Sequence, residues 1–213
     1  MHTAHDPYAR LLLDQIFSGH GSVVQEYPLP PSPTRRADLV FVPGPTKPEA
    51  VPLGAMARIA VTPCLLEAFS AAPGMASYER VLGKTLEARR QALRLRANPQ
   101  QRAMRDAVLW MLCAGHPRKL LRETRATPIA DAPAGFYTLG AAHPVCIVSL
   151  NALPETDDTL LLRLLAKRLV RRSAQATLRA RALADPRLVP LLETMIEYTR
   201  RLCLLYTSPS PRD

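Results

Sequence analysis

The sequence is poor in aromatic residues, which make up 5% of its 213 residues. A core built mainly on Phe, Tyr and Trp is therefore excluded, and burial must rest on Leu, Val, Ile and Ala. Apolar residues nevertheless make up 47% of the chain, which is too much for a disordered protein. A chain of this length and composition is expected to form one domain with a substantial core.

Cysteine is also scarce, and the four cysteines lie far apart, at Cys64, Cys113, Cys146 and Cys203. None forms a C-x-x-C pair or has a histidine at zinc-ligand spacing, so the usual zinc motifs are excluded. Three of them lie in or beside apolar segments, where a free cysteine behaves as a small apolar side chain. This pattern predicts a reducing compartment and no structural disulfide.

No apolar segment approaches the roughly 20 residues that a membrane-spanning helix requires. The first residues include His2, His5, Asp6 and Arg10 ahead of any apolar run, so we expect no signal peptide. Together these absences predict a cytoplasmic protein that has no membrane partner.

Acidic residues are fewer than basic ones: 18 Asp and Glu stand against 28 Lys and Arg, which gives a formal net charge of +10. Such a charge favours polyanions, including DNA, as partners. The alternative is an arginine-rich surface that only keeps the protein soluble. Net charge does not define a site, so the choice depends on individual residues.

Hydrophobic periodicity and turn residues predict alternating helices and strands. The expected strands are 22–29, 36–42, 63–69, 107–114, 135–139 and 145–150, and the expected helices are 7–17, 53–60, 117–124, one from Ser77 to about residue 97, and several from Thr156 to residue 202. Continuous apolar runs such as 145–148 are typical of strands covered on both faces. This order indicates a mixed α/β sandwich.

Three acidic residues lie on the predicted strands, where acids are otherwise scarce. Asp38 and Glu67 are surrounded by apolar residues, and Glu26 lies on the first strand. Carboxylates on adjacent strands provide the oxygen ligands that Mg²⁺ prefers, and such a metal serves phosphodiester hydrolysis. The alternative is a solvent-facing polar side of the sheet, or ion pairs such as Asp38 with Arg36 or Arg58.

At these residues the chain resembles a group of uncharacterised bacterial proteins, which is in turn similar to the PD-(D/E)XK nuclease superfamily near its recombination-promoting nuclease and transposase-associated branch. The matching segments are 36–43, 53–60, 63–69, 135–140 and 153–163, within a span from Tyr8 to Arg172. The resemblance implies a restriction-endonuclease-like α/β/α sandwich with a mixed sheet, followed here by a helical C-terminal extension. It also implies that Asp38 and Glu67 are catalytic metal ligands and that Glu26 is an accessory ligand.

The chain departs from the superfamily pattern at two positions. Phe69 occupies the place of the lysine that stabilises charge in the transition state, and Ala37 occupies the place of the proline. A cation on the following helix is a candidate replacement for that lysine, either Lys84 or Arg80. We expect Lys84 to take the catalytic role if the site is active.

Basic residues recur on the predicted C-terminal helices. Arg163, Lys167 and Arg171 are spaced four residues apart, which places them on one face of a continuous helix. They are therefore candidates for binding nucleic-acid phosphates. The alternative is a solvated face whose cations lie favourably near a helix C-terminus.

The last eleven residues, Cys203 to Asp213, resemble the translation of a transposon-end sequencing adapter. We therefore expect a nuclease-like core at 1–155, a helical extension packed on it at 156–202, and a non-native tail at 203–213. The expected function is Mg²⁺-dependent hydrolysis of DNA. The alternative is a catalytically inactive module of the same fold that binds nucleic acid or protein.

Overall fold

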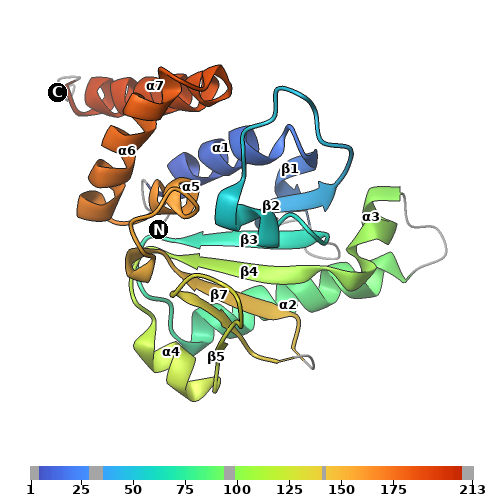
Figure 1. Ribbon diagram of the computed structural model, residues 1–213. Helices are drawn as coiled ribbons and strands as arrows, with labels where there is room; N and C mark the ends of the chain where they lie inside the picture. Colours follow the sequence, from blue (N-terminus) through green and yellow to red (C-terminus); the bar gives the residue numbers. More distant parts are fainter. Residues whose placement is uncertain (1–4, 29–35, 94–98, 141–142, 208–213) are drawn as a thin grey trace, which may run out of the picture.

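The computed structural model describes residues 5–28, 36–93, 99–140 and 143–207. These residues form a mixed α/β structure in which helices cover both faces of one seven-stranded sheet (Figure 1). The α/β class expected from the alternating pattern is therefore confirmed. Among the described residues, no helix is long and apolar enough to cross a membrane.

The sheet has the strand order β1-β2-β3-β4-β7-β6-β5. Its centre is parallel, because β3 runs parallel to β4 and β4 runs parallel to β7. Both sides of this centre continue as antiparallel strands. The strands are β1 Gly21–Pro28, β2 Arg36–Pro43, β3 Cys64–Phe69, β4 Val108–Cys113, β5 Thr127–Pro128, β6 Phe136–Thr138 and β7 Val145–Ser149. The central strands read as continuous apolar runs because both of their faces are covered.

Helices α1, α5, α6 and α7 lie on one side of the sheet, and α2 and α4 lie on the other (Figure 1). The α-helices are α1 His5–Phe17, α2 Met75–Ala92, α3 Pro99–Ala103, α4 Arg118–Glu123, α5 Leu160–Arg163, α6 Arg168–Ala182 and α7 Val189–Thr207, and the short 3₁₀ helices are η1 Gly54–Arg58, η2 Met104–Asp106, η3 Leu150–Ala152 and η4 Pro186–Leu188. The chain thus forms three layers, with the sheet between two layers of helices.

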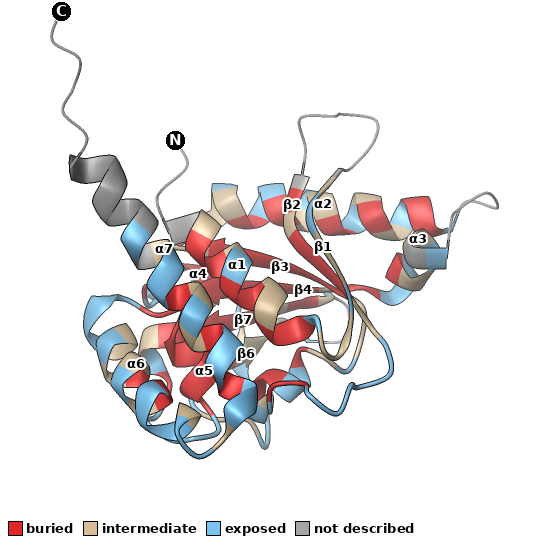
Figure 2. Cartoon of the chain, turned by 90° about the horizontal axis from the view of Figure 1, so that it is seen from above, coloured by how far each residue is buried: buried red, intermediate tan, exposed pale blue. Residues whose placement is uncertain are grey.

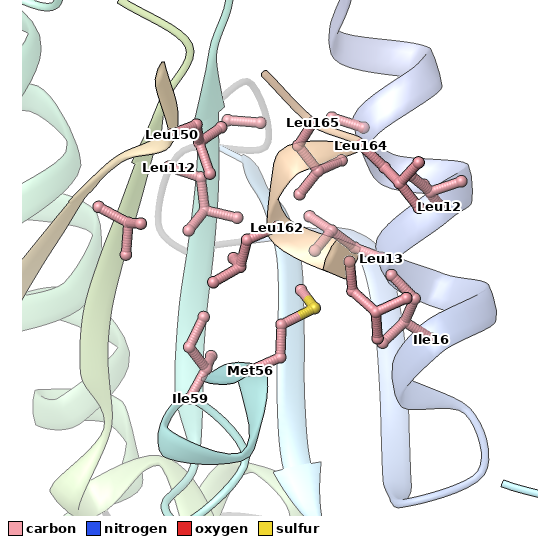
Figure 3. Packing of buried hydrophobic residues seen from close by; sticks show 14 of the residues in the cluster. Leu12, Leu13, Ile16, Met56, Ile59, Leu112, Leu150, Leu162, Leu164 and Leu165 are labelled. Carbon is pink, nitrogen blue, oxygen red and sulfur yellow. The ribbon is translucent and has the colours of Figure 1, made fainter. Parts of the chain in front are cut away.

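Each face of the sheet has its own apolar cluster. On the α1 side, leucines of α1 and α5 pack with η1 and β4 (Figure 3); the residues include Leu12, Leu13, Met56, Leu112 and Leu162. The same cluster includes buried residues of α6 and α7. Residues of the expected helical extension therefore share a core with α1, and Figure 2 shows buried residues recurring along these helices.

The second cluster lies between the sheet and the helices α2 and α4. Tyr78 and Val81 of α2 and Leu120 of α4 pack with Leu65 of β3 and Met111 of β4. Its members alternate along the strands with those of the first cluster, as the two-residue period of a strand requires. Helix α2 lies on this face of the sheet, and its residue Lys84 contacts Glu67 of β3 there.

Several predicted boundaries were wrong. Helix α2 begins at Met75 after Gly74 rather than at Ser77. The helix expected from Thr156 begins only at Leu160 and ends at Arg163, and a new helix starts at Arg168. The expected non-native tail lies mostly outside what is described: α7 runs to Thr207, but the side chains from 201 onward and all of 208–213 are not described.

Candidate functional site

Asp38 and Glu67 lie opposite each other on adjacent strands. Strand β2 pairs antiparallel with β3, with Leu39 opposite Leu66. The same register carried one residue further places Asp38 opposite Glu67, on the same face of the sheet. The backbone N–H of Ala68 donates a hydrogen bond to Asp38 Oδ2 at 3.2 Å, which holds the Asp38 carboxyl against β3. The strand pairing therefore brings the two carboxyl groups together.

The third member of the site is Lys84, which comes from α2. Its Nζ donates a hydrogen bond to Glu67 Oε1 at 2.7 Å. Glu67 is buried, and the side chain of Lys84 is largely buried as well. A buried charge requires a partner, and Lys84 is the ion-pair partner of the buried Glu67 carboxyl group. The structure thus joins Asp38, Glu67 and Lys84 in one cluster on the α2 face of the sheet.

The environment of Glu67 raises the pKa of its carboxyl group to about 7. Burial is the largest cause, because a carboxylate loses its hydration there. The neighbouring charge of Asp38 raises the pKa further, whereas Lys84 and a hydrogen bond from the Asp38 backbone lower it. Glu67 therefore changes its protonation state near neutral pH, which is unusual for a glutamate.

Glu26 takes a different place from the other two acids. The carboxyl group of Glu26 forms an ion pair with Arg10 of α1, the helix on the opposite side of the sheet from α2. Its backbone has a φ of 48°, and its neighbours Gln25 and Tyr27 pair with β2 on either side of it. A positive φ turns a side chain away from the regular alternation of a strand. The structure therefore places the carboxyl group of Glu26 against Arg10 of α1.

The position of the missing lysine is filled by an apolar side chain. Phe69 is partly buried against the α2-side cluster, two residues beyond Glu67 on the same strand face. Arg80, the other candidate cation on α2, is exposed. Of the two candidates, only Lys84 contacts Glu67 among the ion pairs of the described residues.

The interpretation of Arg163, Lys167 and Arg171 as one helical face was wrong. Helix α5 ends at Arg163, and Lys167 has an extended backbone before α6 begins at Arg168. Arg163 is buried, and its Nη2 donates to the backbone oxygen of Thr156 at 3.2 Å. The guanidinium of Arg171 lies over the ring of Tyr8, 5.3 Å from its centroid. Of these three cations, only Lys167 is exposed.

The geometry of the cluster limits what it can bind. No group of three or more His, Cys, Asp or Glu side chains suited to a metal occurs in the described parts of the chain. Two carboxylates still fit Mg²⁺, which keeps several waters and is commonly held by one or two carboxylates together with substrate phosphates. A cavity of about 330 Å³ lies elsewhere, between α1, the segment 47–51 and the start of α7. None of Asp38, Glu67 and Lys84 lines that cavity.

A polar pair that the sequence did not reveal lies at the same end of the sheet. The Nδ1 atom of His116, which follows β4, is 2.8 Å from the Oγ atom of Ser149 at the end of β7. The two residues are 33 positions apart, so no motif joins them. The only sequence feature that could have suggested this contact is the position of both residues at the carboxyl ends of predicted strands, because the carboxyl ends of adjacent parallel strands meet at one edge of a sheet. Ser149 is fully buried, which keeps its hydroxyl from a substrate.

No known protein family, curated protein or solved structure matches this chain. The description of this chain therefore rests on its own fold and on the cluster of Asp38, Glu67 and Lys84. It is a mixed α/β protein in which two strand carboxyl groups and one helix lysine meet on one face of the sheet.

Proposed function

We propose that this domain has a restriction-endonuclease-like fold and hydrolyses phosphodiester bonds in DNA with Mg²⁺. The observation that carries the proposal is the cluster in which Asp38 is hydrogen-bonded to β3 beside Glu67, while Lys84 contacts Glu67. The resemblance to the PD-(D/E)XK nucleases rests on the same two acids, and a lysine from a neighbouring helix stands near them in place of the strand lysine.

The residues of the cluster fit separate roles in this chemistry. The carboxyl groups of Asp38 and Glu67 would hold Mg²⁺, which activates water and stabilises the leaving oxygen when bound. The ammonium of Lys84 would stabilise negative charge that develops on the phosphate, as a fixed cation in a dry site does. The backbone N–H of Ala68 orients the Asp38 carboxyl, so that its position is set before substrate arrives.

The test is cleavage of supercoiled plasmid DNA by the purified protein with and without Mg²⁺. We expect Mg²⁺-dependent nicking by the wild type and a loss of about 100-fold or more in Asp38→Asn and Lys84→Met. Asparagine keeps an oxygen that accepts the Ala68 hydrogen bond, so Asp38→Asn removes charge without removing this contact. Lys84→Arg should retain part of the activity because it keeps a cation at Glu67.

The matched control is Arg80→Ala, which removes an exposed cation one helical turn before Lys84 on α2. It should cleave at the wild-type rate if the cluster, rather than the general charge of α2, is responsible. Equal cleavage by wild type and Asp38→Asn, or cleavage independent of Mg²⁺, would contradict the proposal.

The second candidate is a catalytically inactive module of the same fold that binds nucleic acid or protein. Phe69 favours it, because the residue replaces the usual cation. The Lys84–Glu67 contact also satisfies the buried carboxylate without a metal. A pure nucleic-acid binder would bind DNA with an affinity that falls steeply with salt, because neutralised phosphates release counterions, and would not cleave it.

A further inference from the structure

Helix α4 carries three exposed cations on the same side of the sheet as the cluster of Asp38, Glu67 and Lys84. Arg118 and Arg122 are four residues apart, which places them one turn apart on one side of this helix. Among the ion pairs of the described residues, none includes Arg118 or Arg122. Like charges at this spacing destabilise a helix, so an anion that contacts both arginines would stabilise α4.

The order of the strands brings α4 close to the cluster. Glu67 lies opposite Met111 of β4, and each is two residues from the end of its strand. Figure 1 shows α4 at the end of the sheet to which the arrows of β3 and β4 point. The chain from Met111 to Arg118 spans at most about 25 Å. One turn of a DNA duplex is about 34 Å long, so a single duplex can reach both α4 and the cluster.

The residue that precedes α4 is oriented by a buried side chain. His116 is exposed, and its Nδ1 atom is 2.8 Å from the Oγ atom of Ser149, which is fully buried. When the Ser149 hydroxyl donates to Nδ1, the proton of a neutral imidazole lies on Nε2. The Nε2 atom then points away from Ser149 and can donate to a phosphate oxygen. An exposed donor is thus held in a fixed orientation beside the cations of α4.

We propose that the α4 edge, defined as His116, Arg118, Lys119 and Arg122, binds the phosphate backbone of the DNA on which the cluster acts. This inference rests on the proposed function, because the cluster makes DNA the expected anion at this end of the sheet. The cations would neutralise phosphates and fix the position of the duplex without reading its sequence. The α4 edge takes the place of the basic face expected on the C-terminal helices, which the structure does not form.

The composition of the α4 edge fits nucleic acid better than a protein or a membrane. Large apolar side chains are exposed at several positions among the described residues, but none of these lies between residues 114 and 126. The centre of a protein interface is typically apolar or aromatic, and a membrane surface binds helices that carry an apolar face. Cations and an imidazole donor are instead the groups that contact the DNA backbone.

The test is the binding of the full chain to a fluorescently labelled DNA duplex of about two helical turns, measured by fluorescence anisotropy at several salt concentrations. EDTA in the buffer prevents cleavage, so that only binding is measured. The α4 variant carries Arg118→Glu and Arg122→Glu. We expect its affinity to fall by about tenfold or more, and the slope of log affinity against log salt to decrease in size by about 2, because two phosphate contacts are lost.

A second variant tests the orientation of His116. Ser149→Ala removes the hydroxyl that holds the ring but changes no charge. It should weaken binding by about threefold or more, as the loss of one hydrogen bond does, and should leave the salt slope unchanged. An unchanged affinity would remove His116 from the α4 edge.

The matched control carries Arg172→Glu and Arg179→Glu on α6, where both arginines are exposed on the other side of the sheet. It changes the net charge by the same amount as the α4 variant and should keep the wild-type salt slope. Thermal unfolding checks that each variant is folded, and Arg118→Ala with Arg122→Ala is a milder change that should reduce the slope in the same way.

Equal weakening by the α4 and α6 variants, wild-type binding by the α4 variant, or a wild type that does not bind the duplex would overturn the proposal. Plasmid cleavage is measured separately, so that the two failures can be told apart. A wild type that binds through the α4 edge without cleaving contradicts only the proposed hydrolysis. A wild type that cleaves, with an α4 variant that binds normally, contradicts only this inference.

Discussion

At the scale of single residues, Glu67 is the most informative side chain in the molecule. It is 5% exposed, lies opposite a second carboxyl group and contacts Lys84. Burial dominates, so the pKa of its carboxyl rises from 4.5 to about 7 despite the lysine. In the proposed function, a proton and Mg²⁺ would therefore compete for this carboxyl group near neutral pH.

The raised pKa of Glu67 also predicts how the stability of the metal-free protein depends on pH. The folded protein holds the Glu67 proton more tightly than the unfolded chain, so the protonated form stabilises the fold. This stabilisation is fully present below about pH 4.5 and is lost as the pH rises to about 7, and the total loss is roughly 3 kcal/mol. Denaturant unfolding of the wild type and Glu67→Gln at several pH values measures it.

The informative quantity is the difference between the two proteins, because other groups titrate in both. We expect the free energy of unfolding of the wild type to fall relative to Glu67→Gln across this range and to level off above it. A difference that stays constant with pH would show that Glu67 keeps an ordinary pKa.

The residues of the cluster differ in how far they could be predicted from the sequence. Asp38 and Glu67 lie in short apolar strands, and an acid in such a strand is conspicuous without any structure. Lys84 could be named only as one of two cations on the next helix, because the loop between β3 and α2 sets which turn faces Glu67. The position of Glu26 could not be predicted, because its positive φ is not indicated by the residue types around it.

At the scale of elements, the main error concerned α5 and α6. Residues 160–166 are mostly leucine and read as one continuous helix with the residues after them. In the structure the whole segment from Leu160 to Ala166 is buried, and the chain turns before Arg168. Periodicity cannot reveal this break, because Arg163, Lys167 and Arg171 keep a four-residue spacing across it. The pattern therefore predicts a surface position for Arg163, which is buried.

The 3₁₀ helix η1 depends on a close backbone contact at Gly54. This residue has a φ of +52°, and a Cβ atom there would lie 2.4 Å from the backbone oxygen of Asp158. The same oxygen accepts a hydrogen bond from the N–H of Ala55 at 2.8 Å. We expect Gly54→Ala to lower the free energy of unfolding by about 2 kcal/mol or more, because it strains the backbone and separates η1 from the segment before α5.

The matched control for Gly54 is Gly83, which lies on the exposed side of α2. A Cβ atom at Gly83 would meet nothing within 4 Å, so Gly83→Ala should stabilise the protein by about 0.5–1 kcal/mol. Urea unfolding compares the two variants directly. Similar effects of both substitutions would show that the close approach of Gly54 to Asp158 contributes nothing.

At the scale of the whole molecule, composition and periodicity were sufficient for the α/β class and for most strands. The core could be expected to rest on aliphatic residues, and both clusters do so. The strand order could not be predicted, because it depends on which strands pair across long loops. The distribution of charge on the surface could not be predicted from the sequence either, because it depends on which arginines of the C-terminal helices are buried.

The central claim is that Asp38 and Glu67 together hold a divalent metal ion. Mn²⁺ takes the same oxygen ligands as Mg²⁺ and is detected by electron paramagnetic resonance, so a Mn²⁺ titration above pH 7 tests the claim without requiring DNA. We expect one bound ion per chain in the wild type and in Arg80→Ala, and binding that weakens as the pH falls below about 7, where Glu67 is protonated. Asp38→Asn should bind no ion. A wild type that binds no Mn²⁺, or an Asp38→Asn protein that binds it equally well, would contradict the account.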